Sequence, residues 1–236
     1  MDWLILLRNV ALATLPSLFW FWWYVRQDRA NPEPRRFLWR VFLLGALVTV
    51  PSLFLEFTVA LFFPYTAPGL TPTTITGALL IVAPIEELGK FLVVWAGVYR
   101  NRVFNERLDG VIYAVVAALG FATVENVLVV ISSGASILPL RLVTATLLHA
   151  LASGIAGYFV GLAKFAGDAR RARRLVAQGL AIAIVLHGLY DFIAISDSDV
   201  KLILLLVLML LMFLVLDASV RHLKADDAAD RAVRAR

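Results

Sequence analysis

The stretch "LLIVAPIEELGKFLVVWAGVY" (residues 79–99) is apolar enough to cross a membrane, yet it carries Glu86, Glu87 and Lys90 near its middle. A membrane-spanning helix needs about 20 mostly apolar residues. Ionisable side chains inside such a helix are costly, and they usually face the interior of a helix bundle or a water-filled cavity. The stretch therefore predicts a membrane helix with a functional polar face.

The rest of the chain has the composition of a membrane protein. Of its 236 residues, 61% are hydrophobic and only 17% are charged. We expect an all-α fold, a polytopic transmembrane helical bundle that forms a single integral membrane domain over residues 1–236. About seven spans are expected, near residues 3–25, 37–63, 75–99, 109–132, 137–165, 175–195 and 200–220.

Basic residues fall on alternate connections between these spans. By the positive-inside rule, the basic connections and the end of the chain face the cytoplasm, which places the N-terminus outside and requires an odd number of spans. The net charge of +5 is thereby explained by topology and lipid contact rather than by nucleic-acid binding. The residues concerned are Arg26, Arg29, Arg35 and Arg36, then Arg100, Arg102 and Arg107, then Lys164, Arg170, Arg171, Arg173 and Arg174.

Polar residues on four of the expected helices fall at a similar depth, about 10 to 18 Å below the outer surface. Lys90 and Asp191 follow two of these residues at i,i+4 spacing, so each pair shares a helix face. We therefore expect one buried cluster of polar side chains. The four residues are Glu86, Glu125, His149 and His187.

Pro84 immediately precedes the acidic pair. Its ring and missing N–H should kink the helix or restart it. A restart would place Glu86 and Glu87 in a first helical turn, where the helix dipole favours carboxylates.

Structural roles are expected for two other groups. Glu56 and Arg141 carry opposite charges in the outer third of their helices and are expected to form a buried pair. Gly157 and Gly161 form a small-xxx-small face that allows a neighbouring helix to approach closely.

Four motifs on successive helices resemble those of the PrsW family of intramembrane proteases, which is similar to the CAAX prenyl endopeptidases. The resemblance covers residues 75–195, the expected catalytic core, and leaves residues 221–236 as a cytoplasmic tail. It implies a prokaryotic plasma-membrane enzyme that hydrolyses a peptide bond of a membrane-anchored protein, such as an anti-sigma factor. The motifs are "EELGK" (86–90), "FATVEN" (121–126), "HALASGIAGY" (149–158) and "HGLYDF" (187–192).

The resemblance also implies roles for the motif residues. Glu86 is the expected base that activates a water, with Glu87 as its partner, and Lys90 would keep one of the two glutamates ionised. His187 would donate to the developing oxyanion, and His149 could share the water. Asn126 is expected to support the site.

Two positions depart from the CAAX pattern, which has histidine and asparagine where this chain has Glu125 and Asp191. Asp191 must either be protonated or accept a hydrogen bond from the His187 ring and fix its tautomer, and we favour the second role. Glu125 would complete a two-histidine, one-carboxylate zinc set.

Three functions therefore remain open. The favoured one is a glutamate-activated water with no cofactor, because the chain has no H-x-x-x-H or H-E-x-x-H signature. The second is a zinc-dependent protease with Zn²⁺ held by His149, His187 and either Glu125 or Glu86. The third is a non-enzymatic proton-coupled carrier or membrane regulatory scaffold. Cysteine chemistry is excluded, because the chain contains no cysteine.

The same lack of cysteine makes the topology directly testable with single-cysteine variants. We expect a membrane-impermeant maleimide to label Ser133→Cys from outside intact cells and Ala172→Cys only after the cytoplasmic side is opened, because arginines flank Ala172. The connections at 64–74 and 133–138 should be external and the one at 164–174 cytoplasmic. Labelling of both cysteines from one side would contradict the seven-span topology.

Overall fold

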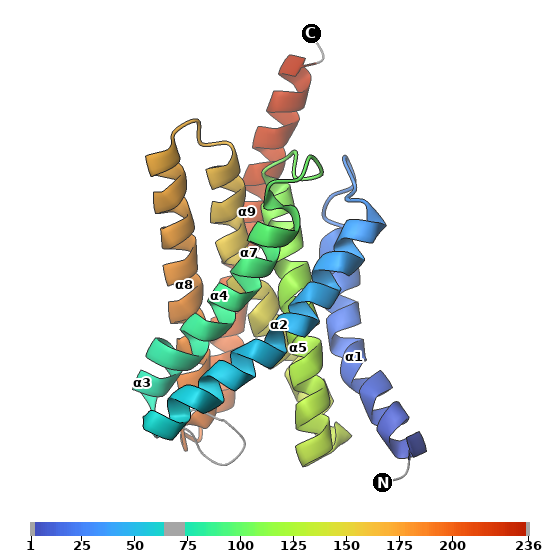
Figure 1. Cartoon of the computed structure of the whole chain (residues 1–236), viewed down its shortest axis with the longest axis vertical. Coiled ribbons are helices and arrows are strands. Elements are labelled where there is room, and N and C mark those ends of the chain that lie inside the picture. The colour runs from blue at the N-terminus through green and yellow to red at the C-terminus, as the bar shows by residue number, and fades with distance from the viewer. Residues whose placement is uncertain (1–2, 64–73, 235–236) are drawn as a thin grey trace.

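The computed structural model describes residues 3–63 and 74–234, and within them the chain is entirely helical. The expected all-α fold is therefore confirmed. Two π-helical segments, η1 (Ala78–Val82) and η2 (Trp95–Tyr99), and one 3-10 turn, η3 (Ala135–Ile137), interrupt the α-helices. The α-helices, shown in Figure 1, are α1 (Trp3–Val25), α2 (Arg35–Phe62), α3 (Ile75–Gly77), α4 (Ala83–Val94), α5 (Leu108–Ser133), α6 (Leu138–Val143), α7 (Ala145–Lys164), α8 (Ala169–Ile195) and α9 (Lys201–Arg234).

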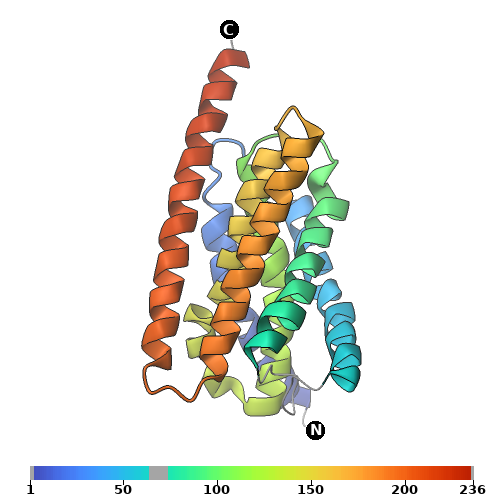
Figure 2. The same cartoon turned by 90° about the vertical axis from the view of Figure 1, so that its left-hand side faces the viewer.

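Among the described residues, six helical stretches are long and apolar enough to cross a membrane. The expected seventh, over 75–99, is not one of them, and it carries three charged residues, Glu86, Glu87 and Lys90, near its middle. It nevertheless runs along the bundle, and α4 packs against α2 and α8 (Figures 1 and 2). The six stretches are Trp3–Val25, Arg35–Phe62, Leu108–Ser133, Ala135–Lys164, Ala169–Ile195 and Lys201–Val233.

The connections that carry basic residues lie together at one end of the bundle, with the C-terminus, and the N-terminus lies at the other end (Figure 1). Contacts across this end join distant parts of the chain. Lys224 Nζ on α9 lies 3.0 Å from Gln27 Oε1 in the first connection, and Arg231 lies 2.6 Å from Glu106 in the third. The side of the membrane that this end faces stays a prediction, and most of the expected external connection at 64–74 lies outside the described residues.

The last helix is longer than the sequence suggested. α9 continues to Arg234, so residues 221–234 extend a helix instead of forming a separate tail. Alanines and i,i+4 charge pairs such as Asp217–Arg221 favour this extension. Asp227 on the extension accepts hydrogen bonds from the backbone N–H groups of Arg107 and Leu108, each at 3.0 Å. A carboxylate from α9 thus satisfies two donors at the start of α5.

The arginines of the fifth connection also prove to be helical. α8 begins at Ala169, earlier than the expected 175, because Asp168 caps it and accepts hydrogen bonds from the backbone N–H groups of Arg170 and Arg171. The hydrogen bond from the N–H of Arg171, and after it the one from Arg170, hold the pKa of the Asp168 carboxyl below its ordinary value. The arginines therefore occupy the first turns of α8 at the basic end of the bundle.

Two interruptions of helical geometry position the polar residues of the core. The π-helical η1 ends at Val82 and passes directly into α4 at Ala83, with Glu86 in the first turn of α4. The backbone stays helical at Val82, with a φ of −65° and a ψ of −61°, so the hydrogen-bond register changes just before Pro84 without the start of a separate helix. The single span expected over 137–165 is broken at Thr144, whose φ of −122° and ψ of −96° separate α6 from α7. α7 therefore begins shortly before His149.

The close approach expected at Gly157 and Gly161 is confirmed. A Cβ atom added to Gly157 would lie 2.3 Å from the carbonyl oxygen of Gly110, and one added to Gly161 would lie 2.0 Å from that of Arg107. Side chains larger than hydrogen would therefore separate α7 from α5, the two helices at the centre of the bundle.

We predict that Gly161→Ala lowers the midpoint of thermal unfolding by several degrees, because the new Cβ would overlap rigid backbone and overpacking costs about 1 to 3 kcal/mol. Thermal unfolding of the detergent-purified protein measures the effect. Gly97→Ala is the matched control, because its Cβ would meet only side-chain atoms of Leu44 and Val41 at 3.6 and 3.8 Å. Equal midpoints for the two variants would contradict this account of the packing.

Candidate active site

Lys90 is the centre of the buried polar cluster. Its Nζ atom lies 3.0 Å from Glu86 Oε2 and 2.9 Å from Glu87 Oε1, and its side chain is 1% exposed. The same atom lies 2.8 Å from Nδ1 of His149 on α7 and 4.4 Å from the ring centroid of Phe121 on α5. One ammonium group thus joins the glutamate pair of α4 to two other helices.

Glu87 fixes the orientation of His187. Its Oε1 atom lies 2.8 Å from His187 Nδ1, and its Oε2 atom accepts a hydrogen bond from Ser153 Oγ at 2.8 Å. The ring-orienting role expected of Asp191 therefore belongs to Glu87. Asp191 Oδ2 lies 3.7 Å from the other ring nitrogen, Nε2, which is beyond hydrogen-bond range.

His149 is held from both sides. Its Nε2 atom lies 2.6 Å from Glu125 Oε2, so this nitrogen carries the proton and donates it, while Nδ1 accepts from Lys90. Arg141 Nη2 lies 3.6 Å from Glu125 Oε2. Glu125 thus joins the cluster as expected from its depth, and it connects His149 to a positive charge at the edge of the site.

Two carboxylate oxygens, from Glu86 and Asp191, lie close to the Nε2 atom of His187. Because Nδ1 of His187 donates to Glu87, its Nε2 presents a lone pair. That nitrogen lies 3.6 Å from Glu86 Oε2 and 3.7 Å from Asp191 Oδ2. Among the described residues, no hydrogen bond reaches this buried Asp191 oxygen. Three acceptors at such distances favour a cation or a water between them.

The same place has the ligand types of a transition-metal site. Glu86, His149 and His187 each offer one ligand atom within 4.8 Å of the others, and all three residues are buried. Two imidazoles and one carboxylate are a usual ligand set for a catalytic zinc ion, with an open position for water. The hydrogen bond from His187 to Glu87 is of the kind that orients metal-binding histidines.

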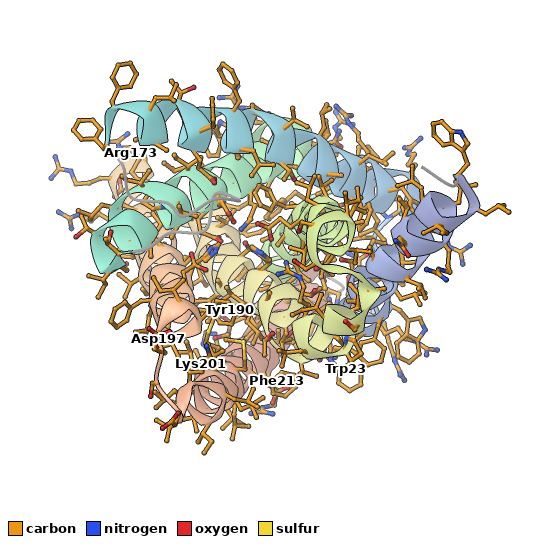
Figure 3. The ribbon with its side chains drawn as sticks, turned by 90° about the horizontal axis from the view of Figure 1, so that it is seen from below. Trp23, Arg173, Tyr190, Asp197, Lys201 and Phe213 are labelled. Carbon is orange, nitrogen blue, oxygen red and sulfur yellow. The ribbon has the colours of Figure 1, made fainter. Side chains whose placement is uncertain are left out.

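A cavity of about 280 Å³ opens onto this group. Figure 3 looks along the bundle from the end that contains Asp197 and Lys201, and it labels Tyr190 of α8, one of the residues that line the cavity. The polar and charged residues of the lining are Glu56, Glu86, Glu125, Arg141, His149, His187, Tyr190 and Asp191.

Sequence reasoning assigned two of these lining residues, Glu56 and Arg141, to a structural pair. Arg141 instead contacts Glu125 and donates a hydrogen bond at 2.5 Å from Nε to Oδ1 of Asn126, which itself donates to Thr146. The sequence did contain a hint of this, because it places Glu56 and Arg141 in the outer third of their helices, near the depth of the cluster. Asn126 therefore supports the site through Arg141.

Glu87 and Lys90 lie behind the cavity. Neither lines it, although Glu86 does. The two glutamates, expected to act as partners, do not both face the cavity, because adjacent residues of a helix point about 100° apart. Glu86 therefore faces the cavity, while Glu87 faces Ser153 and the His187 ring.

Fold and site together define a class of protein: a multi-pass membrane protein with a buried group of histidines and carboxylates that is suited to hydrolysis. Comparison with known proteins gives the family. A family model described as "PrsW family intramembrane metalloprotease" matches residues 33–217, so the chain belongs to the PrsW family and is an intramembrane protease.

Curated proteases of bacteria resemble the chain along most of its length. Protease PrsW of Oceanobacillus iheyensis is 33% identical over 172 residues, which cover 73% of this chain and 76% of that protein. Protease PrsW of Geobacillus kaustophilus is 30% identical over 187 residues, covering 79% and 80%. Protease PrsW of Bacillus subtilis is 28% identical over 195 residues, covering 80% and 84%. No solved structure matches the chain.

These comparisons decide between the functions left open by the sequence. They show an intramembrane protease, which acts on protein substrates, and not a carrier or a scaffold. They do not support the favoured metal-free mechanism, because the family is described as one of metalloproteases. The zinc alternative is the better supported of the two mechanisms.

We predict that Lys90→Met lowers the free energy of unfolding by about 3 to 5 kcal/mol, because it leaves buried carboxylates without their cation. Unfolding by denaturant in mixed micelles measures the loss, and Lys201→Met, at an exposed lysine, is the control. Adding Glu87→Gln to Lys90→Met should restore part of the stability. A loss that is the same with and without Glu87→Gln would show that Lys90 acts independently of that carboxylate.

Proposed function

We propose that the chain is a metal-dependent intramembrane endopeptidase that hydrolyses a peptide bond of a membrane-anchored protein. In this proposal Glu86, His149 and His187 hold one divalent ion, and zinc suits this ligand set best. The observation that carries the proposal is that Glu86 Oε2 and Asp191 Oδ2 lie 3.6 and 3.7 Å from His187 Nε2, while within the described residues no hydrogen bond reaches the buried Asp191 oxygen.

The residues around this position fit a metal under one condition. Lys90 Nζ lies 2.8 Å from His149 Nδ1, so the ammonium must withdraw toward Glu87 before this nitrogen can bind an ion. Glu87 lies 2.9 Å from the ammonium and can retain it. When bound, the metal would lower the pKa of a water molecule and polarise the carbonyl group of the substrate.

The remaining residues have roles that follow from their geometry. Asp191 lines the cavity, and its Oδ2 atom is placed to accept a proton from a water beside His187 Nε2. Arg141 contributes a positive charge to the same cavity and can stabilise the negative oxygen that develops on the substrate. His187 is less suited to donate to that oxygen, because its proton is bonded to Glu87.

We also propose that the bundle crosses the membrane seven times, with the N-terminus outside. The gathering of basic segments at one end supports this arrangement, since the positive-inside rule places that end in the cytoplasm. The cavity is lined by residues near the opposite end of the bundle, such as Ala145 at the start of α7 and Ile195 at the end of α8. Cleavage would then occur in the outer half of the membrane.

We predict that the purified protein contains about one zinc ion per chain, and that a strong chelator abolishes proteolysis until Zn²⁺ is added back. His187→Ala should lose most of the metal and reduce the cleavage rate by about 10² to 10⁴. The controls are metal analysis and cleavage of His222→Ala, because His222 is exposed on α9 and far along the chain from the site. Full activity without bound metal would contradict the metal mechanism.

Protease activity itself is tested separately, through its substrates. Quantitative proteomics of membranes from cells with and without Glu86→Gln should reveal an uncut membrane-anchored protein that accumulates in the variant. The carboxylate of Glu86 both faces the cavity and belongs to the proposed ligand set, so the isosteric amide removes its charge with little change of shape. Identical membrane proteomes would argue against proteolysis by this site.

A further inference from the structure

A second group of carboxylates lies at the basic end of the bundle, away from the cavity. Asp28 and Glu33 belong to the connection between α1 and α2, and Asp109 lies in the first turn of α5. They are 4%, 6% and 0% exposed, respectively. One carboxylate oxygen of each residue lies within 4.8 Å of those of the other two. Three acidic side chains from two parts of the chain are thus buried together.

Two of these side chains have an oxygen without a partner. Asp28 Oδ1 accepts a hydrogen bond from the backbone N–H of Asn31 at 3.1 Å, but within the described chain no hydrogen bond reaches its buried Oδ2. Asp109 Oδ2 accepts from the backbone N–H groups of Asn105 and Glu106 at 2.7 and 2.8 Å, and its buried Oδ1 likewise has no such partner. Buried oxygens of this kind are rare unless a ligand or water satisfies them.

Two arginines near this group, Arg107 and Arg231, are engaged with other carboxylates. Arg107 pairs with Asp227 and Asp230, and Arg231 pairs with Glu106. In the part of the chain that the structure describes, no Lys or Arg forms an ion pair with Asp28, Glu33 or Asp109. The phenol of Tyr113 donates a hydrogen bond to Glu33, which adds a further oxygen near the group.

Burial raises the pKa of Asp28 and of Glu33 above the ordinary value of each. This is the expected effect on carboxylates that lose water and do not form an ion pair. Their ionised forms are therefore costly here unless a positive charge is supplied from outside the chain.

We propose that Asp28, Glu33 and Asp109 form a binding site for a hard divalent cation, Ca²⁺ or Mg²⁺, separate from the active site. Carboxylate oxygens without nitrogen or sulfur ligands are the preferred surroundings of these two ions. A cavity of about 540 Å³, which Asp28 helps to line, adjoins the group and gives it a route to water. A bound ion would tie the α1–α2 connection to the start of α5.

The competing explanation is a proton shared between carboxyl groups. Glu33 and Asp109 have carboxylate oxygens within 4.8 Å of each other, so one of them can remain neutral and, after a small shift, bond to the other without any ion. The two explanations differ in what an amide substitution does. An amide replaces a neutral carboxyl group with little loss, whereas it removes both the charge and one ligand oxygen from a cation site.

The test uses the full-length protein in nanodiscs of neutral lipid, stripped with chelator and titrated with Ca²⁺ or Mg²⁺ up to about 10 mM, a range that covers weak protein sites. Calorimetry should show about one ion bound per chain for one of the two ions. The midpoint of thermal unfolding should rise by about 5 to 10 °C at a hundredfold excess over the dissociation constant. Neither ion favours the histidines of the proposed active site.

Asp109→Asn should weaken binding at least about tenfold, as loss of a charged ligand does, and should remove the rise in unfolding midpoint. Glu33→Gln lies in a connection rather than in a helix, and it repeats the test if Asp109→Asn does not fold. Asp226→Asn, which makes the same change of charge at an exposed position, should bind the ion normally. The proposal is overturned if the unchanged protein binds neither ion, or if Asp109→Asn and Glu33→Gln bind as well as Asp226→Asn.

Discussion

The ammonium group of Lys90 is the interaction on which the site depends. Two adjacent carboxylates cannot be buried in a membrane helix without a cation, because desolvation of each ion costs several kcal/mol. Lys90 provides this cation from the same helix, at i+4 and i+3 from Glu86 and Glu87. Because it also reaches His149 on α7, the charges that allow α4 to be buried also align it with a second helix.

The adjacent glutamates have different environments for a simple geometric reason. A step of one residue turns a helix by about 100°, so Glu86 reaches the cavity while Glu87 points into the protein. Glu87 then holds the Ser153 hydroxyl and the His187 ring. Glu86 is thus placed to take part in the reaction, and Glu87 is placed to orient His187. Neither residue can replace the other without a rotation of α4.

The sequence predicted the fold well, because hydropathy reports burial in lipid directly. It also predicted which helices meet, since polar residues at one depth must share an interior, and Glu86, Glu125 and His149 do meet. It did not predict which side chain orients His187, because Glu87 and Asp191 each approach a ring nitrogen, at 2.8 Å from Nδ1 and 3.7 Å from Nε2, and only the first distance is that of a hydrogen bond. Nor did it predict the helical extension at 221–234, where composition alone suggested a charged tail.

Contacts between distant parts of the chain were beyond the reach of sequence patterns. Arg141 and Glu56 were expected to be buried charges, but Arg141 reaches the cavity from α6, which the break at Thr144 separates from α7, and Glu56 reaches it from α2. No sequence pattern connected Asp28, Glu33 and Asp109. Only the packing of the α1–α2 connection on α5 brings them together.

The contact of Asp227 with α5 has a consequence for the order of assembly. The backbone N–H groups of Arg107 and Leu108 donate to the carboxylate of Asp227, which is synthesised about 120 residues later. Until then these two donors lack this acceptor. By that time Glu86, Glu125, His149 and His187 have all been synthesised. The start of α5 is therefore completed last, and a nascent chain that stops before α9 would hold every residue of the site on a scaffold not yet closed.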